Sequence, residues 1–323
     1  MKKLVILSVG MLLTLAACNN DESGTAQSSN DGTALFTASI DGQRVTRASN
    51  AKWDNNDRIG ISGTCGTKPY TNVCYKTSNG SGNDFEFEAG DKIYYQDMNE
   101  VNFTAYYPWK EALTASTTIA FSTDEQANQK DFDFLWAQGK GSKNSPKVDF
   151  GFTHQMSKIA ITVKAGNDIT CEEVKAAVCY LKNHQHQGTF DREAGTATTT
   201  GDQSAEWAFA NNTANQSYNT PDIVTDDSKN SVTYGLILTP QTFTPESLLT
   251  FTAKVTTGEA TGPQNFSAAI ELNQIPENNN ANELKPGIQY NITINVNKTG
   301  LSIGECSISD WTKYSYETDA DMQ

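Results

Sequence analysis

From Ala34 onward, hydrophobic and polar residues alternate along many short segments of the chain. In the segment 158–164, for example, Ile159, Ile161 and Val163 are separated by small, hydroxyl-bearing or charged residues. Because successive side chains of a strand point to opposite faces, this period of two predicts strands with one face on a core and one in water. The predicted strands are 35–40, 58–62, 84–88, 101–107, 158–164, 232–238, 249–256, 265–272, 290–296 and 304–308.

Turn-forming residues (Gly, Asn, Asp and Pro) separate these segments, and helical periodicity is scarce. Only the stretch 169–181 fits a helix as well as a strand. The long polar stretches 193–204 and 211–219 are predicted to be surface loops. Many short strands spaced by turns favour antiparallel sheets packed as β-sandwiches, so we predict an all-β fold of antiparallel β-sandwich domains.

The first 17 residues have the pattern of a secretory signal rather than of a folded segment. Two lysines precede a mostly apolar run over residues 4–15, and small residues then lead into Cys18. A dozen apolar residues are too few for a membrane span, which needs about 20. We predict cleavage between Ala17 and Cys18 and attachment of lipid to Cys18, whose acyl chains then anchor the protein in a membrane.

The length of the remaining chain and its turn-forming residues predict how it is divided into domains. Cleavage leaves 323 − 17 = 306 residues, which is more than one typical core, so two domains are expected. The best boundary is the turn-forming Gly166-Asn167-Asp168. The predicted divisions are a signal peptide at 1–17, a flexible tether at 18–32, an N-terminal domain at 33–165 and a C-terminal domain at 166–323.

The charge of the chain excludes one class of partner. The formal net charge is −14 at pH 7, and loss of the two lysines of the signal peptide changes it to −16. An acidic chain repels phosphate backbones, and no cluster of Lys or Arg offsets this repulsion. Nucleic acid is therefore excluded as a partner.

Five cysteines remain besides Cys18, and two pairs of them lie close in the sequence. Export permits disulfides, so Cys65 with Cys74 and Cys171 with Cys179 are candidate pairs. The alternative is that these cysteines are buried free thiols. Neither pair has the CxxC spacing of a zinc site.

Candidate catalytic and metal-binding residues are few. His184 and His186 are two residues apart, which on a strand places both rings on one face near Cys179. The simpler interpretation is a pair of solvent-exposed histidines on a hairpin, and His154 is interpreted as a packing or hydrogen-bonding residue. The sequence has no GxSxG, HExxH or phosphate-binding loop motif. We predict no enzyme activity, no metal and no cofactor.

The chain also has five tryptophans and 12 tyrosines. Such rings can form a platform for a sugar if they face solvent. In a β-sandwich they more often fill the core or its rim, which is the interpretation favoured here.

Seven short motifs appear in an order that resembles the fimbrillin family of Bacteroidetes, specifically the Mfa-like fimbrillins of type V pili. Each motif alone is weak, but together they extend over nearly the whole mature chain. The motifs are TRA at 46–48, WDNNDRIGI at 53–61, VNFTAYYP at 101–108, FGFTHQMSKI at 150–159, LILTPQ at 236–241, LKPGIQY at 284–290 and ISDW at 308–311.

The resemblance implies two transthyretin-like β-sandwich domains, export as a lipoprotein and a role in fimbriae. Asp21 and Glu22, soon after the lipidated cysteine, resemble the acidic signal that sends lipoproteins of this phylum to the cell surface. In stalk subunits of the family, a protease cuts after an Arg near the N-terminus. The first strand is then lost, and a neighbouring subunit fills the groove with a strand of its own.

The chain has the parts that this assembly requires. Phe36, Ala38 and Ile40 alternate with polar residues, as a removable buried strand should. The bond between Arg47 and Ala48 is the candidate processing site, and an ordinary loop arginine is the alternative interpretation. Arg44 offers a second place to cut, and the apolar residues of 303–311 lead into a short tail that could be donated.

The expected function is that of a fimbrial subunit or a fimbria-associated surface lipoprotein in cell adhesion. Its expected partners are other fimbrial subunits, either further copies or tip and anchor proteins, and outer-membrane lipid through Cys18. The alternative is a non-polymerising surface lipoprotein that binds a glycan or a host protein. Stalk, tip and anchor roles all fit the sequence.

Overall fold

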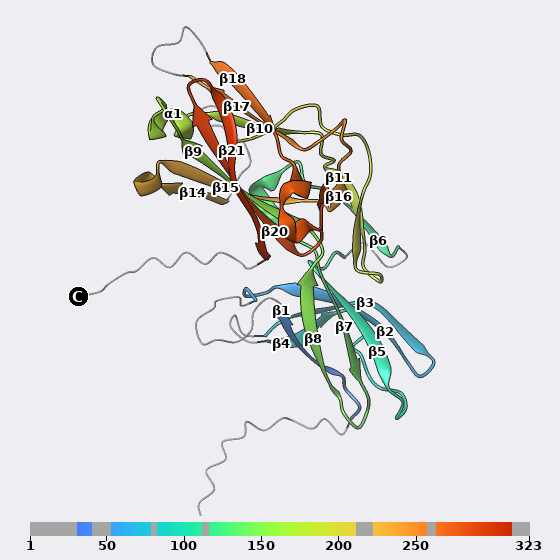
Figure 1. The fold of residues 1–323 in the computed structure, drawn as a ribbon. Coiled ribbons are helices and arrows are strands. Elements are labelled where there is room, and N and C mark those ends of the chain that lie inside the picture. Colours follow the sequence, from blue (N-terminus) through green and yellow to red (C-terminus); the bar gives the residue numbers. More distant parts are fainter. Residues whose placement is uncertain are drawn as a thin grey trace, which may run out of the picture. The chain divides into compact units, whose positions relative to one another are not determined.

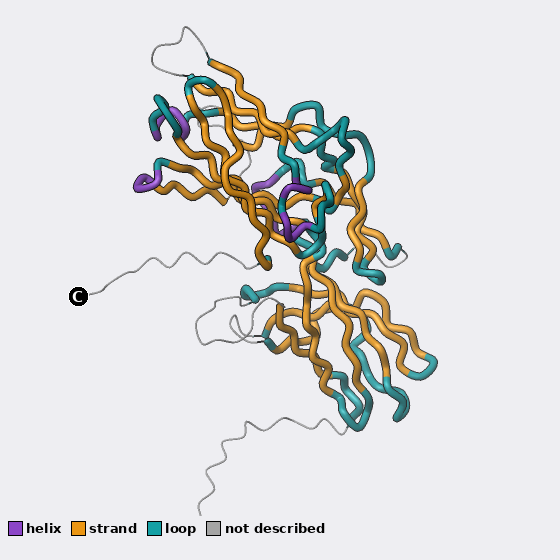
Figure 2. Tube along the Cα trace, viewed as in Figure 1, coloured by secondary structure: helices purple, strands orange, loops and turns teal. Residues whose placement is uncertain are grey.

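Strands make up more than half of the residues that the structure describes, as Figure 2 shows in orange. The structure is a computed structural model, and it describes residues 31–40, 53–78, 83–111, 116–210, 222–256 and 263–311. Within these ranges, no helix has the length and the apolar composition to cross a bilayer. The prediction of an all-β fold is confirmed.

The first ladder of strands closes on itself as a barrel with the order β1-β4-β3-β2-β5-β7-β8 (Figure 1). Strand β1 closes it, because it pairs antiparallel with β4 on one side and parallel with β8 on the other. Buried hydrophobic residues from Ala34 to Phe152 form its core. The strands are β1 (Leu35–Ile40), β2 (Arg58–Cys65), β3 (Lys68–Thr77), β4 (Asp84–Ala89), β5 (Val101–Tyr107), β7 (Leu135–Gly141) and β8 (Lys147–His154).

Two further sheets, ordered β13-β10-β17-β18 and β14-β15-β9-β20-β21, contribute side chains to a second core. A two-stranded sheet, β16-β19, adds Leu284 to the same core. The strands are β9 (Ser157–Ala165), β10 (Val178–Lys182), β13 (Trp207–Ala210), β14 (Asp222–Asp226), β15 (Ser231–Leu238), β16 (Gln241–Thr242), β17 (Thr250–Val255), β18 (Gln264–Ala269), β19 (Glu283–Leu284), β20 (Ile288–Asn297) and β21 (Gly300–Asp310).

A three-stranded sheet joins segments that are far apart in the sequence. Its strand order is β12-β11-β6. Strand β6 (Thr118–Ser122) lies between β5 and β7 in the sequence, and β11 (Gln187–Asp191) follows β10. Strand β12 (Thr196–Thr199) lies inside the stretch 193–204, so the prediction that this stretch is only a surface loop is wrong. The predicted loop 211–219 lies outside the described residues. A small core cluster that includes Phe134 and Phe190 packs beside this sheet.

The ambiguous stretch 169–181 contains both a helix and a strand, since α1 (Cys171–Lys175) precedes β10. Thr170 starts the helix, because its side chain accepts a hydrogen bond from the Glu173 backbone while the Glu173 side chain bonds back to Thr170. This capping box defines the helix start. The 3-10 helices are η1 (Gln126–Asp131), η2 (Asp227–Lys229), η3 (Leu272–Gln274) and η4 (Pro276–Asn278).

The architecture differs in two respects from a pair of antiparallel sandwiches. The first ladder is a closed barrel, and two pairings among the described strands, β1 with β8 and β9 with β20, are parallel. Parallel pairing is possible here because each of these pairs joins strands that are distant in sequence, so that no hairpin forces them to be antiparallel. The domain boundary at residue 166 stays a prediction; strand β9, which ends just before it, already packs in the second core.

Candidate functional site

The residues predicted to carry lipid attachment and processing, Ala17, Cys18, Arg47 and Ala48, lie outside the described residues. The structure does describe the strand that these processing steps concern. Strand β1 lies between the predicted tether and Arg47, and the groove that it fills is therefore the candidate functional site.

Strand β1 inserts one face into the barrel core. Phe36 and Ala38 are each 2% exposed, and Ile40 packs at the edge of the same core. Leu35 and Ser39 point to the other face and are exposed. The alternation predicted from the sequence is therefore confirmed for this strand, and it places three hydrophobic side chains in the groove.

Aromatic rings surround the largest of these side chains. The ring of Phe36 meets Tyr75 edge to face with centroids 4.8 Å apart, and Phe103 in the same manner at 5.5 Å. It also stacks on Phe150 of β8 at 5.8 Å. Such aromatic pairs contribute about 0.5–1.5 kcal/mol each beyond burial of area. Phe36 is thus the main hydrophobic anchor of β1.

The backbone of β1 is held unequally on its two sides. All six residues from Leu35 to Ile40 are in register with Lys147 to Phe152 of β8. Toward β4, Phe36 and Thr37 are the residues that have strand partners within the described part of the chain. One more backbone bond follows on this side, from the Ala38 N–H to the Asn83 carbonyl at 2.8 Å. Most of the ladder energy of β1 therefore comes from β8.

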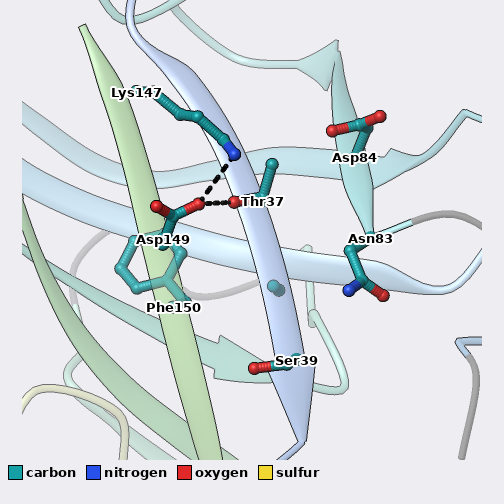
Figure 3. A pocket seen from close by; sticks show the side chains of 8 residues that line it. Thr37, Ser39, Asn83, Asp84, Lys147, Asp149 and Phe150 are labelled. Atoms are coloured by element: carbon teal, nitrogen blue, oxygen red, sulfur yellow. Dashed lines mark hydrogen bonds and ion pairs between the residues drawn. The ribbon is translucent and has the colours of Figure 1, made fainter. Parts of the chain in front are cut away.

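A cavity of about 470 Å³ lies against β1 where its pairing with β4 ends. Figure 3 shows Lys147 and Asp149 of β8 on one side of β1 and Asn83 and Asp84 on the other. The Thr37 hydroxyl donates to the Asp149 carboxylate, and Lys147 lies 3.1 Å from the same carboxylate. The hydrogen bond from Thr37, followed by the contact with Lys147, lowers the pKa of Asp149. This side of the groove is polar, in contrast to its aromatic interior.

Trp53 binds β1 from inside the barrel. Its indole Nε1–H donates to the Ala38 carbonyl at 2.9 Å, and the side chain is only 3% exposed. Trp53 belongs to one of the sequence motifs, but its role at β1 could not be predicted from that motif. No local pattern reveals it, because the bond joins residues 15 positions apart in the sequence.

The cysteines of the two candidate disulfides are all free thiols in the structure. Cys74 lies opposite Gly60, five residues before Cys65 on β2, which is a separation of about 16 Å along the strand. Cα atoms more than about 7 Å apart cannot be bridged without backbone movement. Burial raises the pKa of Cys65 and of Cys74 to about 11, as in inert buried thiols. The pair Cys171 and Cys179 is likewise unbonded, with Cys179 fully buried.

The simpler interpretation, that His184 and His186 are solvent-exposed, is wrong. Both are buried, and they lie in the segment of sequence between β10 and β11. Their Nε2 atoms lie 2.7 Å apart, and the ring of Trp207 packs against both. His186 Nδ1 is 3.0 Å from the Thr123 hydroxyl. Burial lowers the pKa of His184 to about 3 and that of His186 to about 4. Among the described residues, no three or more His, Cys, Asp or Glu side chains are grouped to hold a metal.

His154 has the packing and hydrogen-bonding role predicted for it. Its ring stacks on Trp311 with centroids 4.0 Å apart, and its Nδ1 lies 2.8 Å from an Asp133 carboxylate oxygen. The tryptophans follow the interpretation as core and rim residues. Three are buried and the other two pack against a core cluster: Trp53, Trp207, Trp311, Trp109 and Trp136.

The chain is similar in sequence to a known family and to a known protein. A family model described as fimbrillin-like matches residues 46–311. A candidate fimbrium subunit of Bacteroides uniformis, Fim1C, is 29% identical over 327 residues, which cover 96% of this chain and 95% of that protein.

Two solved structures are also similar, each of a candidate cell adhesion protein. One, from Bacteroides uniformis, has a TM-score of 0.67 and 26% identity, and the match covers 87% of this chain and 100% of that one. The other, from Bacteroides ovatus, has a TM-score of 0.64 and 23% identity over 88% and 99% of the two chains, a likeness of fold alone. Because the family model matches well over half of the sequence, the chain belongs to the fimbrillin-like family.

Proposed function

We propose that this chain is a fimbrial subunit that is exported as a lipoprotein, cut after Arg47 and assembled by exchange of strand β1. One observation carries the proposal: β1 fills a core groove with its side chains, yet among the described residues it pairs with β4 at only two positions. Arg47 follows the end of β1 by seven residues (47 − 40). A cut there separates β1 from the remainder of the barrel.

Loss of β1 would leave a groove that another strand can fill. The side chains of Phe36, Ala38 and Ile40 would depart, and the rings around Phe36 would lose their partner. Exposing one buried aromatic side chain costs about 1.5–3 kcal/mol. A strand from a neighbouring subunit restores this burial, and its backbone regains the parallel ladder with β8. Strand exchange therefore joins two subunits without any new fold.

The proposal agrees with the family of the chain and with its predicted export. Fimbrillin-like membership and the similarity to a candidate fimbrium subunit support a role in fimbriae and cell adhesion. A lipid on Cys18 would tether the precursor to the outer membrane at the cell surface. Cleavage at Arg47 would then release the subunit, so the tether would be temporary.

The test is the N-terminal residue of the protein isolated from cells and from shed surface material. We expect mass spectrometry to find chains that begin at Ala48 in SDS-resistant oligomers. An Arg47→Ala variant should lose this product and the oligomers, whereas the matched Arg44→Ala variant should keep both. Polymers made only of full-length chains that begin at lipidated Cys18 would contradict the proposal.

The same measurement identifies the other predicted role. A non-polymerising surface lipoprotein that binds a glycan or a host protein would appear as monomers that begin at Cys18. Tip and anchor subunits would appear in the polymers at low copy number, which quantitative mass spectrometry of purified fimbriae would show.

A further inference from the structure

Trp53 is hydrogen-bonded to β1 at Ala38, the residue that follows the two residues paired with β4. Ala38 donates its N–H to Asn83, and its carbonyl accepts the indole N–H of Trp53. The N–H and C=O of one strand residue point to the same side, so both bonds lie on the β4 side. A tryptophan side chain is therefore the partner of the Ala38 carbonyl, where a neighbouring strand would ordinarily supply a backbone N–H.

The indole is held firmly in this position. The Trp53 ring meets Phe85, Tyr107 and Phe152 edge to face, with centroids 5.2, 5.5 and 5.3 Å away. Trp53 also follows Arg47 by six residues (53 − 47), so it would stay with the barrel after the proposed cut. Once β1 departs, its buried N–H has lost its acceptor, which is unfavourable until another carbonyl arrives.

The position of this donor restricts how a new strand can lie. A shift of one residue turns the carbonyl at position 38 toward β8 and exchanges the two faces of the strand. A shift of two keeps the faces but places Phe36 or Ile40 at position 38. That position lies opposite Phe150 and beside the Trp53 indole, in a core already filled by rings. A large side chain there would overpack the core.

We infer that Trp53 sets the register of the strand in the β1 groove and selects strands whose inward residues run aromatic, small, aliphatic. The sequence Phe36, Ala38, Ile40 is one such series. The inference rests on the proposed function for its partner, a strand donated by another subunit. The contact between Trp53 and β1 exists in the unprocessed chain and can be tested there.

The first experiment measures hydrogen exchange of β1 in the full chain. Trp53→Phe keeps an aromatic ring and removes the N–H, and we expect β1 amides to exchange about five- to tenfold faster. Trp136→Phe is the matched control, because Trp136 Nε1 donates to the Arg192 carbonyl at 3.1 Å, away from β1. Equal exchange of β1 in both variants would overturn the role of Trp53.

The second experiment uses the chain cut after Arg47 and a synthetic peptide of residues 33–42. We expect this peptide to rebind, and an Ala38→Leu peptide to bind at least tenfold more weakly. A Leu35→Phe peptide, which adds volume on the exposed face, should bind within about twofold of the original. The Trp53→Phe chain should discriminate less between the original peptide and the Ala38→Leu peptide.

The two experiments separate the inference from the function on which it rests. If the original peptide never rebinds, strand exchange fails, while the exchange rates of β1 still decide the role of Trp53. If the peptide rebinds but the Ala38→Leu peptide binds equally well, strand exchange stands and selection at position 38 is wrong.

Discussion

Strands β1 and β9 share one hydrophobic pattern but are held very differently. Strand β9 pairs with β15 at eight of its residues on one side and with β20 at eight of its residues on the other. Strand β1 pairs with β8 over six residues but, where the structure describes both strands, with β4 at only two. The inward side chains of both strands are buried, including Ile161 in β9 and Phe36 in β1. Alternation in the sequence therefore reports burial and says little about how firmly a strand is held.

Because of this difference, we expect β1 to open locally and β9 to open only when the second core unfolds. Removing β9 breaks two full ladders and divides the sheet of the second core. Removing β1 breaks one full ladder and a short one, and the remaining barrel strands keep their consecutive pairing from β4 to β8. Regions open locally when few bonds are lost relative to those that remain. The barrel is therefore expected to release β1 while the second core stays folded.

The largest predicted effect comes from removing the anchor of β1. Phe36→Ala should cost about 3–5 kcal/mol, because a buried aromatic side chain is lost and its cavity collapses only in part. The cost should appear as opening of β1, measured by hydrogen exchange mass spectrometry of residues 33–40. Exchange in β9 should stay at the wild-type rate.

Leu35→Ala is the matched control, because Leu35 lies next to Phe36 but is 38% exposed. It should change exchange in β1 only slightly. Equal acceleration in β1 and β9 after Phe36→Ala would show that the two regions unfold together, and the comparison would fail.

Part of this fold could be predicted because the signal is local. The bounds of β1 and β5 agree with the predicted segments 35–40 and 101–107, where polar and apolar residues alternate. Strand β3 was missed, since four consecutive residues from Asn72 to Tyr75 are buried there and no alternation results. Burial on both faces removes the period of two on which the prediction depends.

For the candidate site, the strand β1 could be predicted from the sequence, but the contacts that hold it could not. The buried face of β1 followed from residues 36–40, but its unequal pairing depends on segments near residues 84 and 147. The hydrogen bond from Trp53 and the burial of His184 depend on contacts between distant segments as well. Such contacts are set by tertiary packing, for which a single sequence has no local pattern.

The second prediction concerns pH. Acid should open the region around His184 and His186 before it opens β1. Burial lowers the pKa of His184 to about 3 and of His186 to about 4. The unfolded chain therefore binds protons first, and stability falls as pH drops below about 6.5, the ordinary pKa of histidine. Between pH 7 and pH 5 each histidine should cost roughly 2 kcal/mol.

Strand β1 should not respond over this range of pH. The pKa of Asp149 is lowered, so its contact with Thr37 contributes above the ordinary pKa of aspartate and is lost only as pH falls through the lowered value. At pH 5, protection relative to the intrinsic exchange rate at that pH should therefore fall around residues 183–187 and not in β1. A His184→Gln, His186→Gln double variant should lose this pH dependence, and Gln185→Ala should retain it. Acceleration confined to β1 would contradict the assignment.

A smaller effect is expected from trimming the well-held strand. Ile161→Val in β9 removes one buried methylene and should cost about 0.5–1.5 kcal/mol. Because β9 is paired on both sides, the loss should appear in chemical denaturation of the second core as a whole. Lys164→Ala, at an exposed position of the same strand, is the control and should shift the midpoint little. A loss seen only as local exchange in β9 would show that this strand also opens alone.

The smallest effect should come from the polar side of the β1 groove. Thr37→Val keeps the shape of the side chain but removes the hydroxyl that donates to Asp149. The contact is partly solvated, so its loss should cost less than about 1 kcal/mol and speed exchange in β1 by less than about fivefold. Ser39→Ala, the next outward position, controls for loss of a hydroxyl and should have a smaller effect. If Thr37→Val releases β1 as fully as Phe36→Ala does, the polar side of the groove, and not its aromatic interior, holds the strand.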